Sequence, residues 1–179
     1  MAYDVFLSWL RSDRSIGRRH ACSQTLGKRA RYRVMPDKIR RMRMAHERFH
    51  RFNTMGRWPN QSIDYDVSLM VRATGRSLFI AGLTGFDLDG KFHGKGDPAA
   101  QADQAMKNLK ILVEEAGGTL QHVCKITTYL LDRTHRDPVY NTVARHLSGV
   151  APCGTGLIIS GLAMADMLVE FDVDVVIPD

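Results

Sequence analysis

The segment His46-Glu47-Arg48-Phe49-His50 fits the pattern H-E-x-x-H, in which two histidines one helical turn apart bind zinc and the glutamate activates water. A zinc protease of this type also needs a third ligand at a defined later position, and no downstream histidine has the spacing of the extended motif. The flanking arginines add positive charge that opposes the binding of a dication. The sequence therefore favours a solvated basic helix here and predicts neither a metal site nor a cofactor.

Three carboxylates alternate with apolar residues near the end of the chain. In a β-strand over 167–176, Glu170, Asp172 and Asp174 share one face, and the residues between them share the other. Such an acidic face is either solvated or lines a cleft shared between subunits, because a sheet covered on one side only often buries its other side by oligomerising. The pattern alone leaves both interpretations open.

The elements that must position these carboxylates are two amphipathic helices and four further strands. Asp97-Pro98 predicts the start of a helix that ends at Gly117-Gly118, and Asp137-Pro138 predicts the start of a second helix that ends at Gly149. Strands are predicted over 67–73, 78–82, 122–131 and 157–160, the first two joined as a hairpin through Thr74-Gly75-Arg76. This order predicts an α+β sandwich in which one sheet carries both helices on one face.

Composition excludes several classes of protein. Hydrophobic residues make up 44% of the 179 residues and charged residues 25%, which is typical of soluble globular chains. No apolar run reaches the roughly 18–20 residues that cross a bilayer. Cys22, Cys124 and Cys153 are too few and too scattered for a disulfide framework or a four-thiolate zinc site. We therefore expect a reducing compartment, the cytoplasm.

The positive charge is confined to the first third of the chain. Residues 1–60 carry 15 Lys and Arg against 4 Asp and Glu, whereas residues 61–179 carry 10 against 15. The change in charge falls near Trp58-Pro59-Asn60. We divide the chain there into a basic N-terminal extension, 1–60, and a folded domain, 61–179.

Several interpretations of the extension compete. A secretory signal is excluded because the apolar core at 5–10 is too short and precedes its arginines. An organelle transit peptide fits the excess of arginine but not Asp4 and Asp13. A nucleic-acid-binding arm is disfavoured because no aromatic platform or groove-reading motif accompanies the arginines. We favour an extension without a catalytic role, part of it upstream of the natural start, since later initiation points are offered by Met35, Met42, Met44 and Met55.

Five segments of the folded domain, taken in order, each match a short sequence motif. Residues 79–85, FIAGLTG, look like the strand F-x-S-G-Q-x-G, and residues 101–110, QADQAMKNLK, are similar to the helix Q-x-x-x-x-x-x-N-L. Residues 115–125, EAGGTLQHVCK, follow E-A-G-x-x-L-x-x-V-x-K, residues 129–132 fit F-L-x-D, and residues 169–173 correspond to V-E-I-E-A. In this order and spacing, the stretch from Leu78 to Val176 resembles the reactive-intermediate deaminase superfamily, RidA/YjgF, also described as L-PSP endoribonuclease.

The resemblance implies a fold and a reaction. The fold is chorismate-mutase-like and assembles as a homotrimeric barrel, with three ligand clefts at the subunit interfaces. The reaction is the hydrolysis of enamines and imines such as 2-aminoacrylate to a keto acid and ammonia, which needs a donor for the substrate carboxylate and a group that positions water and moves a proton. Glu170 and, on the second helix, Asn141 keep family positions.

Two family positions differ in this chain. Gly154, within Ala151-Pro152-Cys153-Gly154-Thr155, stands where active members carry the arginine that clamps the carboxylate. Val67 stands where the family has a substrate-side tyrosine, with Tyr65 two residues away. We therefore do not expect deamination of 2-imino acids.

Two accounts of function stay open. In the first, the chain is a divergent hydrolase for an enamine or imine without that carboxylate: Glu170 orders water, Asn141 supports the cleft, and backbone N–H groups of Gly82 and of the Cys153 to Gly156 loop stabilise an oxyanion. Cys153 is a further candidate nucleophile, and Thr155 and Tyr65 are expected to line the site. In the second account, a trimer of the same fold binds a metabolite or a partner without catalysis. Neither account involves nucleic acid or a membrane.

Overall fold

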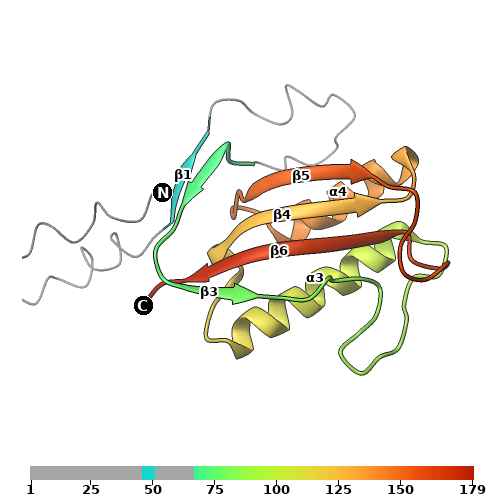
Figure 1. Ribbon diagram of the computed structural model, residues 1–179, viewed down its shortest axis with the longest axis horizontal. Helices are drawn as coiled ribbons and strands as arrows, with labels where there is room; N and C mark the ends of the chain where they lie inside the picture. The colour runs from blue at the N-terminus through green and yellow to red at the C-terminus, as the bar shows by residue number, and fades with distance from the viewer. Residues whose placement is uncertain (1–45, 51–66) are drawn as a thin grey trace, which may run out of the picture. The chain divides into compact units, whose positions relative to one another are not determined.

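A computed structural model describes residues 46–50 and 67–179, which all belong to one compact unit of the chain. A four-stranded sheet forms its centre, in the order β3 (Arg76–Phe79), β6 (Val169–Ile177), β4 (Val123–Leu130) and β5 (Cys153–Ile158) (Figure 1). The β4–β5 pair is parallel and the other pairs are antiparallel, so the sheet is mixed. A separate ribbon pairs β1 (Glu47–Phe49) with β2 (Met70–Arg72). The rest of the predicted extension lies outside the described residues, and so does Tyr65 of the predicted folded domain.

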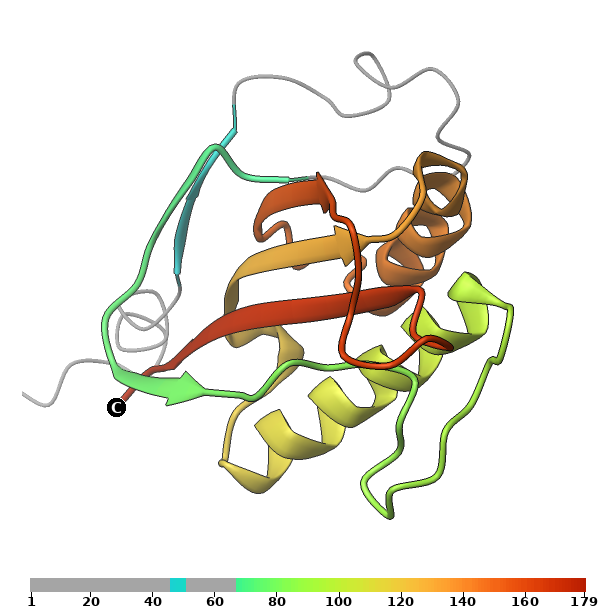
Figure 2. The ribbon, with the colours of Figure 1, turned by 45° about the vertical axis from the view of Figure 1, so that its right-hand side comes forward.

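Two helices, α3 (Pro98–Glu115) and α4 (Arg136–His146), cover one side of the sheet (Figure 2). Short 3-10 turns, Leu120–His122 and Arg133–His135, precede β4 and α4. The predicted α+β architecture, one mixed sheet with both helices on one face, is therefore confirmed. No helix among the described residues is long and apolar enough to cross a membrane.

The core lies between the sheet and the helices. From β6 it takes the alternate residues Val169, Phe171, Val173 and Val175, each at most 5% exposed. From α3 it takes a buried stripe that includes Met106, Leu109 and Val113. The period of two in the strand and the i, i+3, i+4 spacing in the helix were both visible in the sequence. Because these alternate residues of β6 pack against the helices, the residues between them lie on the face that points away from the helices.

The start of α3 is as predicted and the start of α4 is not. The Asp97 side chain accepts hydrogen bonds from the N–H groups of Ala99 (2.9 Å) and Ala100 (3.1 Å), so it caps the helix ahead of Pro98. The second helix begins at Arg136, one residue before Asp137. The N-cap residue of α4 is His135, whose side chain makes no capping hydrogen bond. The Asp132 side chain instead accepts from the N–H of Thr134 and caps the 3-10 turn that leads into the helix.

The predicted hairpin between 67–73 and 78–82 is wrong, although both segments contain strands. β2 pairs with β1, and β3 pairs with β6, where Leu78 lies opposite Val175. An isolated two-stranded hairpin is marginal in water, and pairing with β6 adds the Leu78 side chain to the core. Local turn signals cannot reveal this partner, because it lies about a hundred residues further along the chain.

The predicted basic helix at the H-E-x-x-H segment is also wrong, because Glu47–Phe49 is the strand β1. Glu47 forms an ion pair with Arg72 across the ribbon, and the Leu69 N–H donates to the Phe49 carbonyl at 2.8 Å. Residues four apart in a strand are separated by roughly 13 Å, so the two histidines cannot share an ion as they would on a helix. The described part of the chain contains no group of three side chains able to hold a metal ion.

Arg48 attaches β1 to the rest of the domain. Its guanidinium donates to the carbonyls of Ala151 (3.0 Å), Gln121 (2.8 Å) and Val123 (3.0 Å). Beside it, the ring of His46 lies 5.8 Å from the ring of His122, and the Nε2 atom of His46 is buried without a hydrogen-bond partner among the described residues. Three cationic or protonatable groups therefore crowd the contact between β1 and the domain.

This crowding predicts a loss of stability in weak acid. Burial lowers the pKa of His46 and of His122 below the ordinary value of about 6.5, and the charge of Arg48 lowers both further. The unfolded chain then binds more protons than the folded chain, so the free energy of unfolding falls as the pH drops below about 6.5. We expect the thermal midpoint to fall by a few degrees between pH 7.5 and pH 5.5, at about 2–4 °C for each kcal/mol.

The variants H46Q and H122Q should flatten this dependence, measured by circular dichroism melts across the pH range. Glutamine is neutral, and at position 122 its carbonyl can still accept the Thr119 N–H that His122 Nδ1 accepts at 3.1 Å. A double variant with the same pH slope as the wild type would contradict the explanation.

Candidate functional site

The face of the sheet opposite the helices carries the predicted carboxylates. In β6, Glu170 is half-buried and Asp172 and Asp174 are exposed, in alternation with the core residues. Strand register places Tyr129 of β4 and Leu157 of β5 in line with Glu170, and Thr127 and Thr155 in line with Asp172. A third row contains Phe79, Asp174, Lys125 and Cys153. The sequence predicted that the carboxylates share a face, and the structure supplies their neighbours.

Gly82 lies directly against the carboxyl group of Glu170. The neighbouring residues Leu83 and Phe171 exchange both backbone hydrogen bonds, each at 2.9 Å, and so hold the two segments side by side. A Cβ atom on Gly82 would collide with the Glu170 Oε1 atom and lie 3.0 Å from its Cδ atom. Glycine is therefore required for this close approach. Of the predicted site residues, Gly82 and Glu170 are brought together.

The electrostatics of this face distinguish Glu170 from its neighbour. Burial raises the pKa of Glu170, and the negative charge of Asp172 raises it further. The Tyr129 hydroxyl donates a 2.8 Å hydrogen bond to Asp172 Oδ2, and this bond raises the pKa of Tyr129. Tyr129 therefore keeps its proton, and Glu170 is the carboxyl group on this face whose pKa is raised, which makes it the candidate for proton exchange.

Cys153, Gly154 and Thr155 lie in β5 rather than in a loop, which corrects the prediction that this strand starts at 157. β5 pairs in parallel with β4 over Lys125 to Leu130. Two glycines in six residues weaken the local strand signal, and the pairing with β4 overrides it. Because β5 is the last strand on its side of the sheet, alternate backbone N–H groups point away from β4.

The two glycines of β5 have different surroundings. A Cβ atom on Gly156 would collide with the Tyr140 hydroxyl oxygen of α4, so this glycine makes room for a neighbouring side chain. At Gly154 the nearest atom to an added Cβ would be Val67 Cγ1 at 3.4 Å, an ordinary contact. Gly154 is exposed and has space for a Cβ atom. The chain thus brings together Val67 and Gly154, the two positions that differ from the family pattern.

A short turn with backbone strain leads into β5. Ala151 adopts a φ of 51°, unusual for a residue with a Cβ atom. Its carbonyl accepts hydrogen bonds from Ser68 Oγ (2.7 Å) and Arg48 Nη1 (3.0 Å), and the Ser68 N–H donates to the Pro152 carbonyl at 3.1 Å. These three donors hold the turn in place and fix where Cys153 and Gly154 begin the strand.

Asn141 is not brought to Glu170. It lies on α4, which covers the other side of the sheet, and its Oδ1 atom is buried without a hydrogen-bond partner among the described residues. Tyr65 cannot be placed because it lies outside the described residues. Sequence reasoning missed Tyr129 as a site residue. The alternation of its strand puts it on the face of Thr127, but only the register with β6 brings it beside Glu170 and Asp172.

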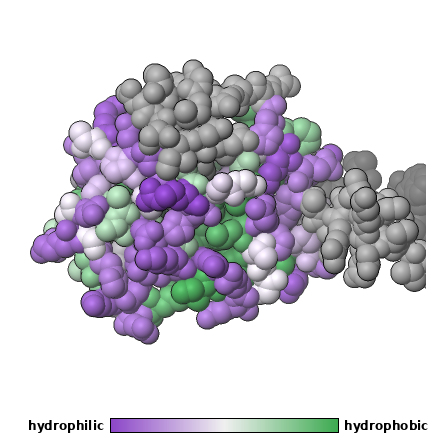
Figure 3. Space-filling view, turned by 180° about the vertical axis from the view of Figure 1, so that it is seen from behind, coloured by the Kyte–Doolittle hydropathy of each residue, from purple (hydrophilic) through white to green (hydrophobic). Residues whose placement is uncertain are grey.

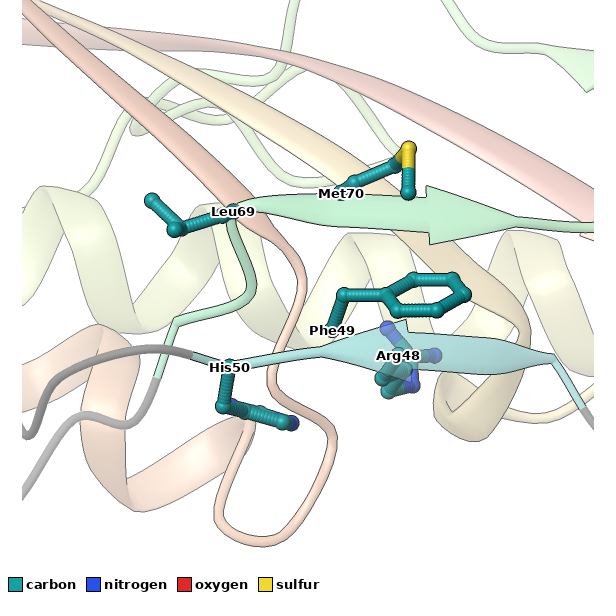
Figure 4. A pocket seen from close by; sticks show the side chains of 5 residues that line it. All are labelled: Arg48, Phe49, His50, Leu69 and Met70. Carbon is teal, nitrogen blue, oxygen red and sulfur yellow. The ribbon is translucent and has the colours of Figure 1, made fainter.

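A hollow on the described surface lies away from these residues. It is lined by Arg48, Phe49, His50, Leu69 and Met70, and Figure 4 shows Phe49 of β1 next to Met70 of β2. None of the predicted site residues lines it. It adjoins the end of β1, so it belongs to the ribbon and not to the carboxylate face.

The carboxylate face also exposes large apolar side chains. Phe79 of β3 is 90% exposed and Leu157 of β5 is 41% exposed. The opposite side of the domain, seen from behind in Figure 3, is largely hydrophilic around a smaller hydrophobic area. Phe79 and Leu157 lie on the two edge strands of the sheet, with the carboxylate row of β6 between them.

Comparison with known proteins assigns the fold to a family. Residues 61–177 match the sequence profile described as Endoribonuclease L-PSP. A RutC family protein of Pyrococcus horikoshii is 32% identical over 98 residues, which are 55% of this chain and 77% of that protein. A second RutC family protein, from Pyrococcus abyssi, is 29% identical over 98 residues, 55% of this chain and 76% of its own length.

Solved structures give the same result. The Rid-family protein YyfB of Yersinia pestis has a TM-score of 0.56 at 24% identity, covering 62% of this chain and 86% of its own. RidA of an Antarctic Psychrobacter has a TM-score of 0.52 at 25% identity, covering 66% of this chain and 100% of its own. With the profile matching well over half of its residues, the chain belongs to the Endoribonuclease L-PSP family, within the RidA/YjgF superfamily.

Proposed function

We propose that this protein is a divergent hydrolase that adds water to the carbon–nitrogen bond of a small enamine or imine. The observation that carries the proposal is the Glu170 carboxyl group, whose pKa is raised by burial and by Asp172 and which lies against the exposed backbone of Gly82. A carboxyl group whose pKa is raised above its ordinary value holds its proton more readily and can serve both as general acid and as general base. Family membership supports the reaction class.

The proposed reaction needs one proton-carrying group and one oxyanion site. Glu170 gives its proton to the enamine carbon, which leaves an iminium ion and the Glu170 carboxylate. The carboxylate then takes a proton from water as the water oxygen bonds to the iminium carbon. Glu170 returns this proton to the nitrogen and then takes the proton of the hydroxyl group as the C–N bond breaks, so that ammonia leaves, the carbonyl product remains and Glu170 is protonated again. Backbone N–H groups of Gly82 and of β5 are the proposed donors to the developing oxyanion, and Asn141 is proposed to support the cleft from α4.

The substrate class follows from the charges near the site. Gly154 offers no cation to a carboxylate, and Asp172 and Glu170 supply negative charge on the open face of the sheet. A substrate carboxylate brought to this face would lose its hydration without gaining a charged partner. The proposed substrate is therefore an enamine or imine that lacks the 2-carboxylate, and Thr155, Cys153 and Tyr65 are the proposed lining residues.

The proposed site is a cleft between subunits of a homotrimer. On one subunit, the sheet separates Glu170 and Gly82 from Gly154, since β4 lies between β6 and β5. The exposed side chains of Phe79 and Leu157 give this face apolar area to bury against a neighbour. A cleft that joins the Glu170 side of one subunit to the β5 edge of the next would bring Glu170 and Gly82 of the first subunit close to Gly154 of the second. We also propose a cytoplasmic location, with which the free thiols of Cys124 and Cys153 accord.

The alternative is a trimer that binds a metabolite or a partner without catalysis. The missing cation at position 154 favours it, because a site that cannot orient its substrate binds without reacting. The residues 1–60, of which only part is described, are proposed in either case as a basic extension without a catalytic role.

The first prediction of this proposal concerns Glu170. Purified protein should accelerate ammonia release from neutral enamines and imines generated in solution, measured with an ammonia-coupled assay. The isosteric variant E170Q cannot exchange a proton and should lower kcat by about 100-fold or more. D174N, on the same face of the same strand but in the row of Phe79, is the matched control and should stay within about twofold of wild type.

Two results would count against this account. If the wild type accelerates none of the substrates, the non-catalytic trimer takes its place. If light scattering on the same preparation finds a stable monomer, the shared cleft is wrong, because one subunit does not unite Glu170 with Gly154.

The second prediction concerns the missing cation. Since a Cβ atom added at the exposed position 154 meets only Val67 at ordinary contact distance, we expect G154R to fold and to provide a guanidinium for a substrate carboxylate. We expect G154R to release ammonia from 2-aminoacrylate at least tenfold faster than wild type, about 1.4 kcal/mol of transition-state stabilisation. G154M controls for size without charge. Equal rates for G154M and G154R, or rapid turnover by the wild type, would show that Gly154 does not decide the substrate class.

The third prediction concerns the proton affinity of Glu170. Removal of the Asp172 charge in D172N should lower the pKa of Glu170 towards its ordinary value of 4.5, without reaching it because burial remains. Carbon-detected NMR titration of the glutamate carboxyl measures this directly. D174N should leave the titration unchanged, and an equal shift in both variants would assign the effect to the general charge of the face.

A further inference from the structure

Two thiols and one guanidinium meet where β4 and β5 begin. Arg48 donates to the carbonyl of Val123, the residue before Cys124, at 3.0 Å. It also donates to the carbonyl of Ala151, two residues before Cys153, at 3.0 Å. The guanidinium therefore bridges the starts of the two strands that carry the cysteines. It forms no ion pair with a carboxylate among the described residues.

A β-bulge turns Cys124 away from the core. The register between β4 and β6 shifts between Val123 and Lys125, so Cys124 is the extra residue in its strand. Val123 and Ile126 are buried under the helices, whereas Cys124 is half-buried and Lys125 is exposed. Cys153 is half-buried and lies in register with Lys125, the residue next to Cys124. The bulge thus places the two thiols on neighbouring positions of adjacent parallel strands.

The two thiols and Arg48 interact electrostatically. Burial raises the pKa of the Cys124 thiol, the positive charge of Arg48 acts in the opposite direction, and Cys153 and Asp174 are near enough to contribute. Both Cys124 and Cys153 act in turn on the guanidinium of Arg48. Both cysteines are free, and the Cys124 thiol donates only a long 3.5 Å hydrogen bond to the His122 carbonyl. The proton transfers proposed for Glu170 use neither thiol.

We propose that Cys124 and Cys153 are an oxidisable pair, which a hydroperoxide converts into a disulfide that ties β4 to β5, with Arg48 as the cation that bridges the starts of the two strands. A cation beside a thiol stabilises the thiolate, which is the nucleophile in each step. Cys153 makes the first attack because burial raises the pKa of the Cys124 thiol, which lowers the thiolate fraction of Cys124. The inference does not depend on the proposed hydrolysis.

The oxidation balances with one hydroperoxide. The Cys153 thiolate attacks the peroxide, an S–O bond forms as the O–O bond breaks, and hydroxide leaves and takes a proton. The Cys124 thiolate then attacks the sulfenic sulfur, the S–S bond forms as the S–O bond breaks, and a second hydroxide leaves. Two thiols lose two electrons and two protons, and hydrogen peroxide is reduced to two waters.

The experiment uses the full chain with C22S, which removes the third cysteine. After hydrogen peroxide treatment, intact-mass spectrometry should show a loss of about 2 Da, the two thiol hydrogens of a new disulfide. Non-reducing peptide mapping should find Cys124 linked to Cys153 within one chain. C124S and C153S should each abolish the linkage. R48M should slow disulfide formation at least several-fold, whereas R48K, which keeps the charge, should lie closer to the C22S parent.

Three results would overturn the proposal. The first is stable sulfenic or sulfinic acid on Cys153 without a linkage, because it shows that Cys124 cannot reach the oxidised sulfur. The second is a disulfide between two chains. The third is an equal rate of linkage in R48M, with circular dichroism confirming that the variant is folded, because it removes Arg48 from the mechanism. The mass measurement and peptide map of the C22S parent need no substitution at Arg48, so the test stands even if such a substitution releases β1.

Discussion

The central strand β6 decides both the stability of the domain and the chemistry of its open face. Its alternate residues from Val169 to Val175 are buried under the helices, and this burial forces Glu170, Asp172 and Asp174 to the other side. A shift of one residue in its pairing would exchange the two sets and place three carboxylates in the core. Burying each large apolar side chain stabilises the fold by roughly 1.5–3 kcal/mol before entropy, so such a shift is excluded. The position of the acidic row is therefore fixed by the packing behind it.

The sequence was sufficient where the determining interactions are local. Asp97 and Pro98 mark the start of α3, and the alternation in β6 identifies its two faces, because both depend on neighbours within a few residues. The nearness of Gly82 to Glu170 was not derivable in this way. It depends on the backbone bridge between Leu83 and Phe171, which are far apart in the chain. A glycine in a strand signals a close approach, but not what approaches it.

The other differences between the sequence predictions and the structure also come from contacts between segments that are distant in the chain. β1 forms because it pairs with β2 and because its Arg48 side chain donates to the Ala151 carbonyl. The sequence of this arginine-rich segment has no apolar period, so it does not indicate either partner. β5 begins at Cys153 because β4 pairs with it, despite two glycines that favour a loop. Gly156 shows what the sequence alone cannot identify. From the sequence, this glycine suggests a close approach to a ligand, whereas in the structure it accommodates the Tyr140 hydroxyl of α4.

The carboxyl groups of Glu170 and Asp172, on the open face of the sheet, have different surroundings. Asp172 is exposed and accepts the hydrogen bond of the Tyr129 hydroxyl, whereas Glu170 is half-buried against Gly82. When a carboxyl group is buried beside another acid, its charged form is disfavoured and its protonated form is favoured. Burial and the neighbouring charge act on Glu170 in the same sense, so both raise its pKa, whereas the Asp172 carboxyl group accepts the hydrogen bond of Tyr129. A polar group that enters beside Gly82 therefore first meets the carboxyl group whose protonated form its surroundings favour.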